Sequence, residues 1–401
     1  MPVSIASSPR SDPRAWVEVA RVFARLGLTA FGGPAAHIAA MEDEIVNRRQ
    51  WISRDEFVDL VGAANLIPGP NSTELAIHIG YRRAGWPGLI AAGVCFIVPA
   101  VLLVWGLAIL YVHNGSRVKA SAILAGLQPV VLAVVVQALW RLRASLVRSR
   151  WTAILAAGSL IAVLSGVSEM TVLVAAIVAS IIIARATIRD DTGSGADPRE
   201  LAAFGAVGAF GAVGAFGAVG AFGAGAAAMS APSVFLSFAK IGSVLFGSGY
   251  VLLTFLRGEF VLRHAALTDA QLLDAIAVGQ ITPGPVFSAA TFVGYLIAGH
   301  AGAAAATAGI FLPAFAGVAL TAPYVARLRG SRRWSSALDG VNAASLALMA
   351  SVVLVMARQI APDPAAVAIL GVAAAVLVFT RVGSGWVLLV GGCLGLLRTL
   401  V

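Results

Sequence analysis

Two stretches of the chain place Pro-Gly-Pro and polar residues inside otherwise apolar sequence. The first runs Leu66-Ile67-Pro68-Gly69-Pro70-Asn71-Ser72-Thr73-Glu74, and the second runs Ile281-Thr282-Pro283-Gly284-Pro285-Val286-Phe287-Ser288. Two prolines around a glycine remove backbone donors and end the preceding helix, and a new helix can begin directly after them. The start of such a helix has unpaired N–H groups and the positive end of the helix dipole, so it can bind an anion. A purely structural proline kink is the alternative.

The candidate substrate-binding residues lie in these breaks and in a second pair of Gly-rich turns, at 31–34 and 246–249. The prolines that break the helices are Pro68, Pro70, Pro283 and Pro285. The candidate donors in the breaks are Gly69, Asn71, Ser72, Thr73, Thr282, Gly284 and Ser288. Those in the Gly-rich turns are Gly32, Gly33 and Gly247.

Two basic residues, Arg25 and Lys240, occupy matching positions in short amphipathic segments before the Gly-rich turns. A basic side chain in or beside a membrane segment is costly and by default functional. Arg25 and Lys240 can supply positive charges to a dianion and strengthen its hydrogen bonds. The alternative is that both side chains snorkel to the lipid headgroups.

Glu74 and His78 lie one turn apart on the helix expected after the first break. A carboxylate four residues from an imidazole can carry a coupled proton, so both residues are candidates for proton coupling. Glu74 can equally serve as a capping-box residue at the start of its helix. The second half has Ala289 and Val293 at the matching positions.

The composition indicates the elements that must position these residues. Of 401 residues, 59% are hydrophobic and 12% are charged, about half the charge of a soluble domain. Several apolar stretches reach the ~20 residues needed to cross a bilayer. We therefore expect an all-α polytopic membrane protein, which excludes a secreted protein, most soluble enzymes and a nucleic-acid-binding partner. The net charge of +9 comes from basic clusters between apolar runs, as in cytoplasmic loops.

The chain repeats itself, which organises these segments into two halves. Glu44, Asp59 and the first Pro-Gly-Pro return at one constant offset, as Glu259, Asp274 and the second Pro-Gly-Pro. Loop charge is reversed between the halves. The loop with Arg82 and Arg83 is basic and its counterpart at 296–301 is not, whereas the loop at 327–333 is more basic than its counterpart. Equivalent loops on opposite sides predict an inverted repeat, as in many secondary transporters.

Inversion requires an odd number of crossings between equivalent loops, so the charge-free Ala/Phe/Gly-rich tract at 201–229 is expected to be a connecting helix. A low-complexity linker is the alternative. This predicts about thirteen transmembrane segments in four regions. These are a disordered cytoplasmic arm at 1–14, a first repeat at 15–200, the connecting helix at 201–229 and a second repeat at 230–401.

The sequence resembles the chromate transporter family, specifically its long two-domain members. The resemblance rests on Phe31-Gly32-Gly33-Pro34, on the first Pro-Gly-Pro stretch and on their equivalents in the second half. It implies two fused, oppositely oriented halves in the bacterial inner membrane that export chromate and confer resistance. Sulfate, a dianion of similar size, is the natural competitor. The second half departs from the pattern, since its Gly-rich turn lacks the proline.

The expected function is therefore secondary active transport of chromate, driven by the proton gradient, with the N-terminus in the cytoplasm. No ATP-binding motif is present in the sequence, and we expect no catalytic residues, no metal site and no cofactor. The expected partners are chromate or sulfate, protons, the lipid bilayer and a second copy of the chain in a homodimer. A sulfate transporter or exchanger and a passive anion channel are the alternatives.

Overall fold

The structure is a computed structural model that describes residues 14–30, 33–64, 67–114, 118–146, 150–188, 229–245, 251–322, 332–380 and 382–397. All regular elements in these ranges are helices, as the sequence predicts. The first half contains α1 (Ala15–Thr29), α2 (Pro34–Met41), the π-helix η1 (Glu42–Arg48), α3 (Arg54–Ala64), α4 (Asn71–Asn114), α5 (Val118–Leu146), α6 (Arg150–Leu164) and α7 (Glu169–Ile188). The second contains α9 (Ala231–Val244), α10 (Val251–Leu256), the π-helix η2 (Arg257–Arg263), α11 (Asp269–Ile281), the 3-10 turn η3 (Val286–Ser288), α12 (Ala289–Thr321), α14 (Arg332–Ile360), α15 (Pro364–Phe379) and α16 (Ser384–Leu397).

The described elements follow the same order in both halves. Each half has an amphipathic helix, a second short helix that continues into a π-helix, a helix that ends before Pro-Gly-Pro, and a long kinked helix. The two π-helices begin at Glu42 and Arg257, which are equivalent positions in the register of the sequence repeat. The kinks in the long helices, at Gly85 and Gly299, are equivalent in the same way. The repeat therefore extends to local irregularities of the backbone.

The long helices α4 and α12 are helical hairpins. Straight, α4 would be about 66 Å long at 1.5 Å per residue, roughly twice the ~30 Å hydrocarbon core of a bilayer. A kink at Gly85 (φ +61°) turns the chain back instead. A Cβ at Gly80 would lie 2.2 Å from the carbonyl oxygen of Gly88, so the two arms are in backbone contact. Gly294 and Gly302 make the equivalent contact in α12.

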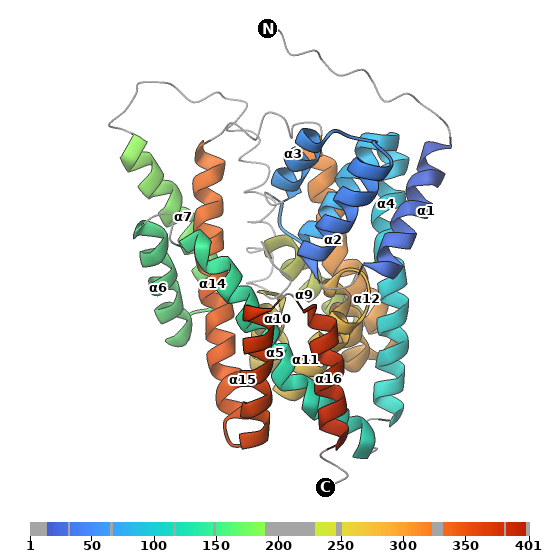
Figure 1. Cartoon of the computed structure of the whole chain (residues 1–401). Coiled ribbons are helices and arrows are strands. Elements are labelled where there is room, and N and C mark those ends of the chain that lie inside the picture. The colour runs from blue at the N-terminus through green and yellow to red at the C-terminus, as the bar shows by residue number, and fades with distance from the viewer. Residues whose placement is uncertain are drawn as a thin grey trace.

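Each half packs its last helices against the other half, as Figure 1 shows. Helix α5 contacts α15 and α16, and α14 contacts α6 and α7. Both contacts depend on a glycine. A Cβ at Gly126 would lie 2.2 Å from the Gly391 carbonyl oxygen, and one at Gly340 would lie 2.6 Å from that of Ala176. The two halves therefore interlock.

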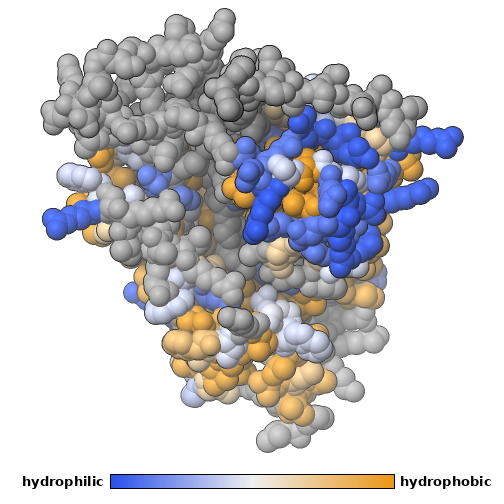
Figure 2. All heavy atoms as spheres, turned by 45° about the horizontal axis from the view of Figure 1, so that its top comes forward, coloured by the Kyte–Doolittle hydropathy of each residue, from blue (hydrophilic) through white to orange (hydrophobic). Residues whose placement is uncertain are grey.

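The surface agrees with a membrane protein. Three described helical stretches, Asn71–His113, Val286–Thr321 and Asp339–Arg358, are long and apolar enough to cross a bilayer. Large apolar side chains are exposed on α4, α6, α15 and α16. Hydrophilic residues gather over the end of the molecule that holds α1 and α3 (Figure 2), opposite the end that holds α15 and α16 (Figure 1). The count of thirteen segments stays a prediction. Residues 1–13 of the predicted arm at 1–14, and residues 201–228 of the predicted connecting helix at 201–229, lie outside the described residues.

Candidate anion site at the crossed helix breaks

Both Pro-Gly-Pro stretches break the helices where the sequence predicts. Helix α3 ends at Ala64 and α4 begins at Asn71, while α11 ends at Ile281 and a 3-10 turn begins at Val286. The central glycines have backbone conformations that other residues rarely adopt, with φ of +141° at Gly69 and +87° at Gly284. Pro68, Pro70, Pro283 and Pro285 flank these glycines and remove four backbone donors.

Each break is hydrogen-bonded to the opposite half of the chain. The Gly69 N–H donates to the carbonyl oxygen of Leu245 at 2.6 Å, and the Gly284 N–H donates to that of Ala30 at 3.0 Å. Ala30 and Leu245 are equivalent residues, because each is the first residue after the first helix of its half. The two bonds are therefore a symmetry-related pair. Each bond joins a Pro-Gly-Pro break to the residue that follows the first helix of the other half, and these two contacts are the crossing of the halves.

Polar side chains with unused hydrogen-bonding capacity flank this crossing. Thr73, Glu74 and His78 on the first turns of α4 are each at most 2% exposed. Oγ1 of Thr73, both carboxyl oxygens of Glu74 and Nε2 of His78 have no hydrogen-bond partner among the described residues. In the second half the same holds for the Gln280 side-chain amide and for the Ser288 hydroxyl. Burying such groups unpaired costs about 1–3 kcal/mol each, so their presence after or beside both Pro-Gly-Pro stretches indicates a site for a polar ligand.

Glu74 lies directly against the first Pro-Gly-Pro turn. A Cβ at Gly69 would be 2.2 Å from Oε1 of Glu74 and 3.2 Å from Cβ of Ala314. The equivalent Gly284 faces the methyl group of Ala100 and no carboxyl group. The sequence predicts this asymmetry, since Ala289 stands where the first half has Glu74. The buried carboxyl group is thus found at only one of the two contacts that make up the crossing.

The remaining hydroxyl candidates differ in what they can offer a ligand. Asn71 is the first residue of α4, and Ser72 and Thr73 follow it into the buried first turn. The Thr282 hydroxyl donates to the Val278 carbonyl oxygen of its own helix at 3.0 Å, so it is already used. Gly33 has a φ of +81° and precedes α2, whereas Gly32 and Gly247 lie outside the described residues.

His37 belongs to the crossing, which the sequence analysis missed. Its side chain is 1% exposed, with Nε2 3.2 Å from the Ala30 carbonyl oxygen and Nδ1 3.3 Å from the Ser72 hydroxyl. A carbonyl oxygen can only accept, so Nε2 carries the proton and Nδ1 accepts from Ser72. His37 thereby ties α2 to the acceptor of Gly284 and to the first turn of α4. Its place just after a predicted break was the signal that could have identified it.

The titration of His37 predicts a pH dependence of stability. Burial lowers the pKa of His37 to about 4, although the hydrogen bond to Ala30 raises it. The folded protein therefore binds fewer protons than the unfolded chain between pH 4 and 6.5. The contribution of neutral His37 to the unfolding free energy is therefore fully present above pH 6.5. The unfolding free energy falls by about 3 kcal/mol as the pH drops to 4. His37→Gln can keep both hydrogen bonds and does not titrate, so its unfolding free energy should change less with pH. An identical pH dependence of unfolding in both proteins would contradict this.

Arg25 and Lys240 are held in equivalent ion clusters. Arg25 lies 3.4 Å from Glu44, and Lys240 lies 3.2 Å from Glu259. Arg48 and Arg49 complete the first cluster, and Arg263 and His264 occupy the same positions in the second. Each cluster joins the first helix of a half to its π-helix. Among the described residues, Arg25 and Lys240 pair with these glutamates rather than with Pro-Gly-Pro, and this favours a structural role over binding the anion.

Removal of these basic side chains should reveal their unequal burial. The Lys240 side chain is 16% exposed and the Arg25 side chain is 60% exposed. Lys240→Ala removes the shortest ion pair of the half-buried Glu259 and should cost about 1.5–3 kcal/mol of unfolding free energy, whereas Arg25→Ala should cost no more than about 1 kcal/mol. Unfolding of the purified variants in detergent measures both. Folded variants with normal stability but without chromate binding would restore the predicted ligand role.

A second buried carboxylate, Asp274 on α11, joins the two halves. It is 4% exposed and accepts hydrogen bonds at 3.0 Å from the Tyr111 hydroxyl and from Gln128 Nε2, both in the first half. The sequence repeat pairs Asp274 with Asp59 but does not indicate these partners. Unlike Glu74, Asp274 has its carboxyl oxygens satisfied, which indicates that it fixes α11 against α4 and α5.

Comparisons with known proteins agree with this architecture. The family model described as chromate transporter matches residues 17–183 and again 232–396, one match in each half. A chromate transport protein of Cupriavidus metallidurans is 31% identical over 378 residues, which cover 93% of this chain and 91% of the relative. A chromate transport protein of Pseudomonas aeruginosa is 29% identical over 86% of this chain and 82% of its own length.

A probable chromate transport protein of Synechococcus elongatus is 27% identical over 85% of this chain and 84% of the relative. No solved structure matches the chain. The family match spans both repeats, and the relatives are similar over most of their length. The all-helical fold with apolar, bilayer-length helices agrees with a transporter of this kind. The chain is a membrane protein that belongs to the chromate transporter family.

Proposed function

We propose that this protein transports tetrahedral oxyanions, chromate foremost, by binding them at the crossed helix breaks. The observation that carries the proposal is the reciprocal pair of hydrogen bonds, Gly69 to Leu245 and Gly284 to Ala30. This pair places two helix starts beside buried, unpartnered polar groups. A dianion needs convergent donors and positive helix ends. The names of the relatives support chromate, and sulfate, with the same shape and charge, is the second candidate.

The donors to the anion are the first-turn groups of α4 and their counterparts in the second half. Asn71 and Thr73 supply side-chain donors in the first half, and Gln280 and Ser288 supply them in the second, whereas the Ser72 hydroxyl already donates to His37. The second half begins with a 3-10 turn rather than an α-helical turn, so its contribution is weaker. Gly69 and Gly284 keep the backbone at the site free of side chains, which lets the halves approach.

Alternating access follows from two halves of opposite orientation. In an inverted repeat, equivalent parts open to opposite sides of the membrane as one half rocks against the other. The Gly69–Leu245 and Gly284–Ala30 hydrogen bonds are such equivalent parts. The surroundings of one bond in the inward-open conformation should therefore match those of the other in the outward-open conformation. The packing of α5 against α15 and α16, and of α14 against α6 and α7, supports the proposal. Because each of these helices packs against the opposite half, a movement of one half is transmitted to the other.

Proton coupling is assigned to Glu74 and His78. An ionised Glu74 beside a bound dianion would repel it, whereas a protonated carboxyl group can donate a hydrogen bond to it. Binding of the anion and binding of a proton are therefore expected to favour each other. His78 lies one turn further along α4 with Nε2 unpartnered among the described residues, and it can pass the proton onward.

We place the protein in the bacterial inner membrane with its N-terminus in the cytoplasm, and we assign the direction as export. The basic loops of the sequence support this orientation. Proteoliposomes that contain the purified protein and an imposed pH gradient test the proposal. We expect saturable chromate flux that sulfate inhibits and that stops when the gradient is dissipated. Flux that rises linearly with concentration would indicate a passive channel instead, and chromate accumulation by intact cells would contradict export.

A further inference from the structure

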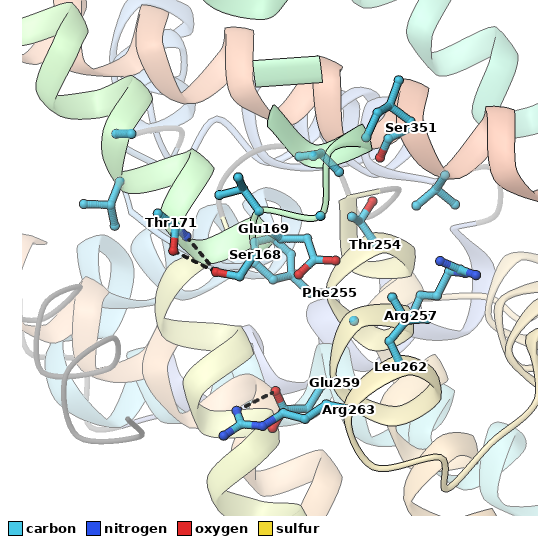
Figure 3. Close-up of a pocket in the computed structure, with 18 of the residues that line it drawn as sticks. Ser168, Glu169, Thr171, Thr254, Phe255, Arg257, Glu259, Leu262, Arg263 and Ser351 are labelled. Atoms are coloured by element: carbon cyan, nitrogen blue, oxygen red, sulfur yellow. Dashed lines mark hydrogen bonds and ion pairs between the residues drawn. The ribbon is translucent and has the colours of Figure 1, made fainter. Parts of the chain in front are cut away.

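A large cavity lies away from the crossing, between the two halves. Its volume is about 1150 Å³, and its walls come from the α6–α7 turn, α7, α9, α10, η2 and α14. Figure 3 shows Ser168, Glu169 and Thr171 at the start of α7 on one side, and Arg257, Glu259 and Arg263 on the η2 side. Sulfate and chromate would occupy only a small part of this space. The cavity therefore suits a larger ligand.

One wall of the cavity is apolar and faces outward. Val174, Val178 and Ile182 on α7 recur at every fourth position, so they form one stripe along the helix. Their side chains are 45–59% exposed, although they are large and hydrophobic. Val352 and Val355 on α14 line the cavity as well. In a membrane protein, such an open apolar wall is suited to contact with an acyl chain.

Other walls of the cavity carry a surplus of basic side chains. Lys240, Arg257, Arg263 and Arg358 line it together with two acidic residues, Glu169 and Glu259. Lys240 is paired with Glu259, and Arg257 with Asp269 outside the lining. Arg263 makes only a 3.7 Å contact with Glu259 and is 43% exposed. Arg358 is exposed and has no ion-pair partner among the described residues. Arg263 and Arg358 are therefore available to an anion.

The corresponding hollow in the first half has no comparable apolar wall among the residues that the structure describes. It measures about 780 Å³ and is lined by residues in and beside α1 and η1, which include Arg14, Arg21, Arg25 and Arg49. Both hollows thus contain part of the ion cluster of their half, including the Arg25–Glu44 pair in one and the Lys240–Glu259 pair in the other. Among the described residues, the larger cavity also has the apolar helix α7 along one side, and the smaller hollow has no such helix. The combination of cation and apolar stripe therefore distinguishes one half from the other.

We propose that this cavity binds an anionic phospholipid. Its phosphate accepts hydrogen bonds from the guanidinium groups of Arg263 and Arg358, and an acyl chain lies along Val174, Val178 and Ile182. Guanidinium groups match phosphate geometry, and basic pockets between transmembrane helices bind anionic headgroups. The lipid would fill the space between α7 of the first half and η2 of the second, and so stabilise their contact.

Lipid binding by the purified full-length protein tests this site. Native mass spectrometry in detergent would titrate phosphatidylglycerol, with phosphatidylcholine and inorganic phosphate in parallel. We expect phosphatidylglycerol to bind more tightly than either. Arg263→Ala and Arg358→Ala should each lower the affinity for phosphatidylglycerol about fivefold, because one basic residue contributes ~1 kcal/mol to the binding of an anionic headgroup. Ala175→Trp fills the apolar side of the cavity along α7. It should therefore weaken the binding of phosphatidylglycerol and of phosphatidylcholine to the same extent.

Arg54→Ala is the matched control, because Arg54 is 78% exposed and lies on α3, outside the cavity. Equal binding of phosphatidylglycerol and phosphatidylcholine would overturn the role of the headgroup charge. Inorganic phosphate that binds as tightly as the lipid would overturn the role of the acyl chain. Unchanged lipid binding in the folded Arg358→Ala variant, which breaks no ion pair among the described residues, would remove Arg358 from the site. None of these outcomes depends on chromate transport.

Discussion

Glu74→Gln should uncouple chromate binding from pH. Glu74 is fully buried beside Gly69, and neither carboxyl oxygen has a hydrogen-bond partner among the described residues. If its protonation accompanies anion binding, chromate affinity in the wild type should change about 5–150-fold between the two protonation states, the usual range of coupling energies. Glutamine has the same shape and cannot ionise. The variant should therefore bind chromate with an affinity that no longer depends on pH, and a pH gradient should no longer drive chromate flux.

Chromate binding measured across a pH series, together with proton flux into proteoliposomes, would test this expectation. Glu56→Gln is the control, because Glu56 is half-buried on α3 and pairs with Arg82 outside the crossing. His78→Gln should lower the rate of coupled transport with a smaller effect on affinity, since His78 lies one turn beyond Glu74. A Glu74→Gln protein that moves protons with chromate as the wild type does would exclude Glu74 from the coupling.

Gly284→Ala should abolish transport because it disturbs the contact between the halves. The new Cβ would lie 2.8 Å from Cβ of Ala100 and 3.1 Å from the Gly27 carbonyl oxygen, at a φ of +87°. Backbone strain at such a φ costs about 1–2 kcal/mol, and overpacking adds about 1–3 kcal/mol. Together these costs should weaken the Gly284–Ala30 hydrogen bond and the closure that depends on it. Gly69→Ala should act similarly, because its Cβ would displace the Glu74 carboxyl group.

Two other glycines separate the causes of this loss. Gly85 has a φ of +61° but open space around it, so Gly85→Ala tests backbone strain alone. Gly62 on α3 has open space and no positive φ, so Gly62→Ala should be neutral or slightly stabilising. Transport rates and unfolding midpoints of the four variants would be compared. Similar losses in Gly85→Ala and Gly284→Ala would show that contact at the crossing is unimportant.

Much of the architecture was predictable from local signals. The scarcity of charge predicted a helical membrane protein, because an apolar backbone in lipid must satisfy its own hydrogen bonds. The constant offset of the sequence repeat predicted equivalent elements, and the π-helices and the residues of the two ion clusters follow it. Proline chemistry predicted the ends of α3 and α11 closely. The inversion of the halves stays a prediction.

The candidate site was predictable only in part. Pro-Gly-Pro, Thr73, Glu74 and Ser288 were identified because local backbone chemistry and polar residues in apolar sequence are visible in one dimension. By residue type Arg25 and Lys240 were equally suited to an anion, but the structure pairs them with Glu44 and Glu259. Each glutamate is separated from its basic partner by a Gly-rich turn, at 31–34 or at 246–249. The sequence does not specify the direction in which the chain leaves such a turn. His37 was overlooked for the same reason, since its importance comes from Ala30 and Ser72 rather than from its neighbours.

The sequence by itself determined that this is a duplicated, all-helical membrane protein of the chromate transporter family, with two pairs of helix breaks. Hydropathy, proline geometry and repeat register act over short distances, so they can be read along the chain. Only the tertiary structure decided that each Pro-Gly-Pro turn is bonded to the opposite half, through Gly69 to Leu245 and Gly284 to Ala30. These partners lie in opposite halves, far apart in the sequence. Their contact depends on how whole helices pack. Gly27 and Gly242, and the glycines at the kinks in α4 and α12, permit that packing.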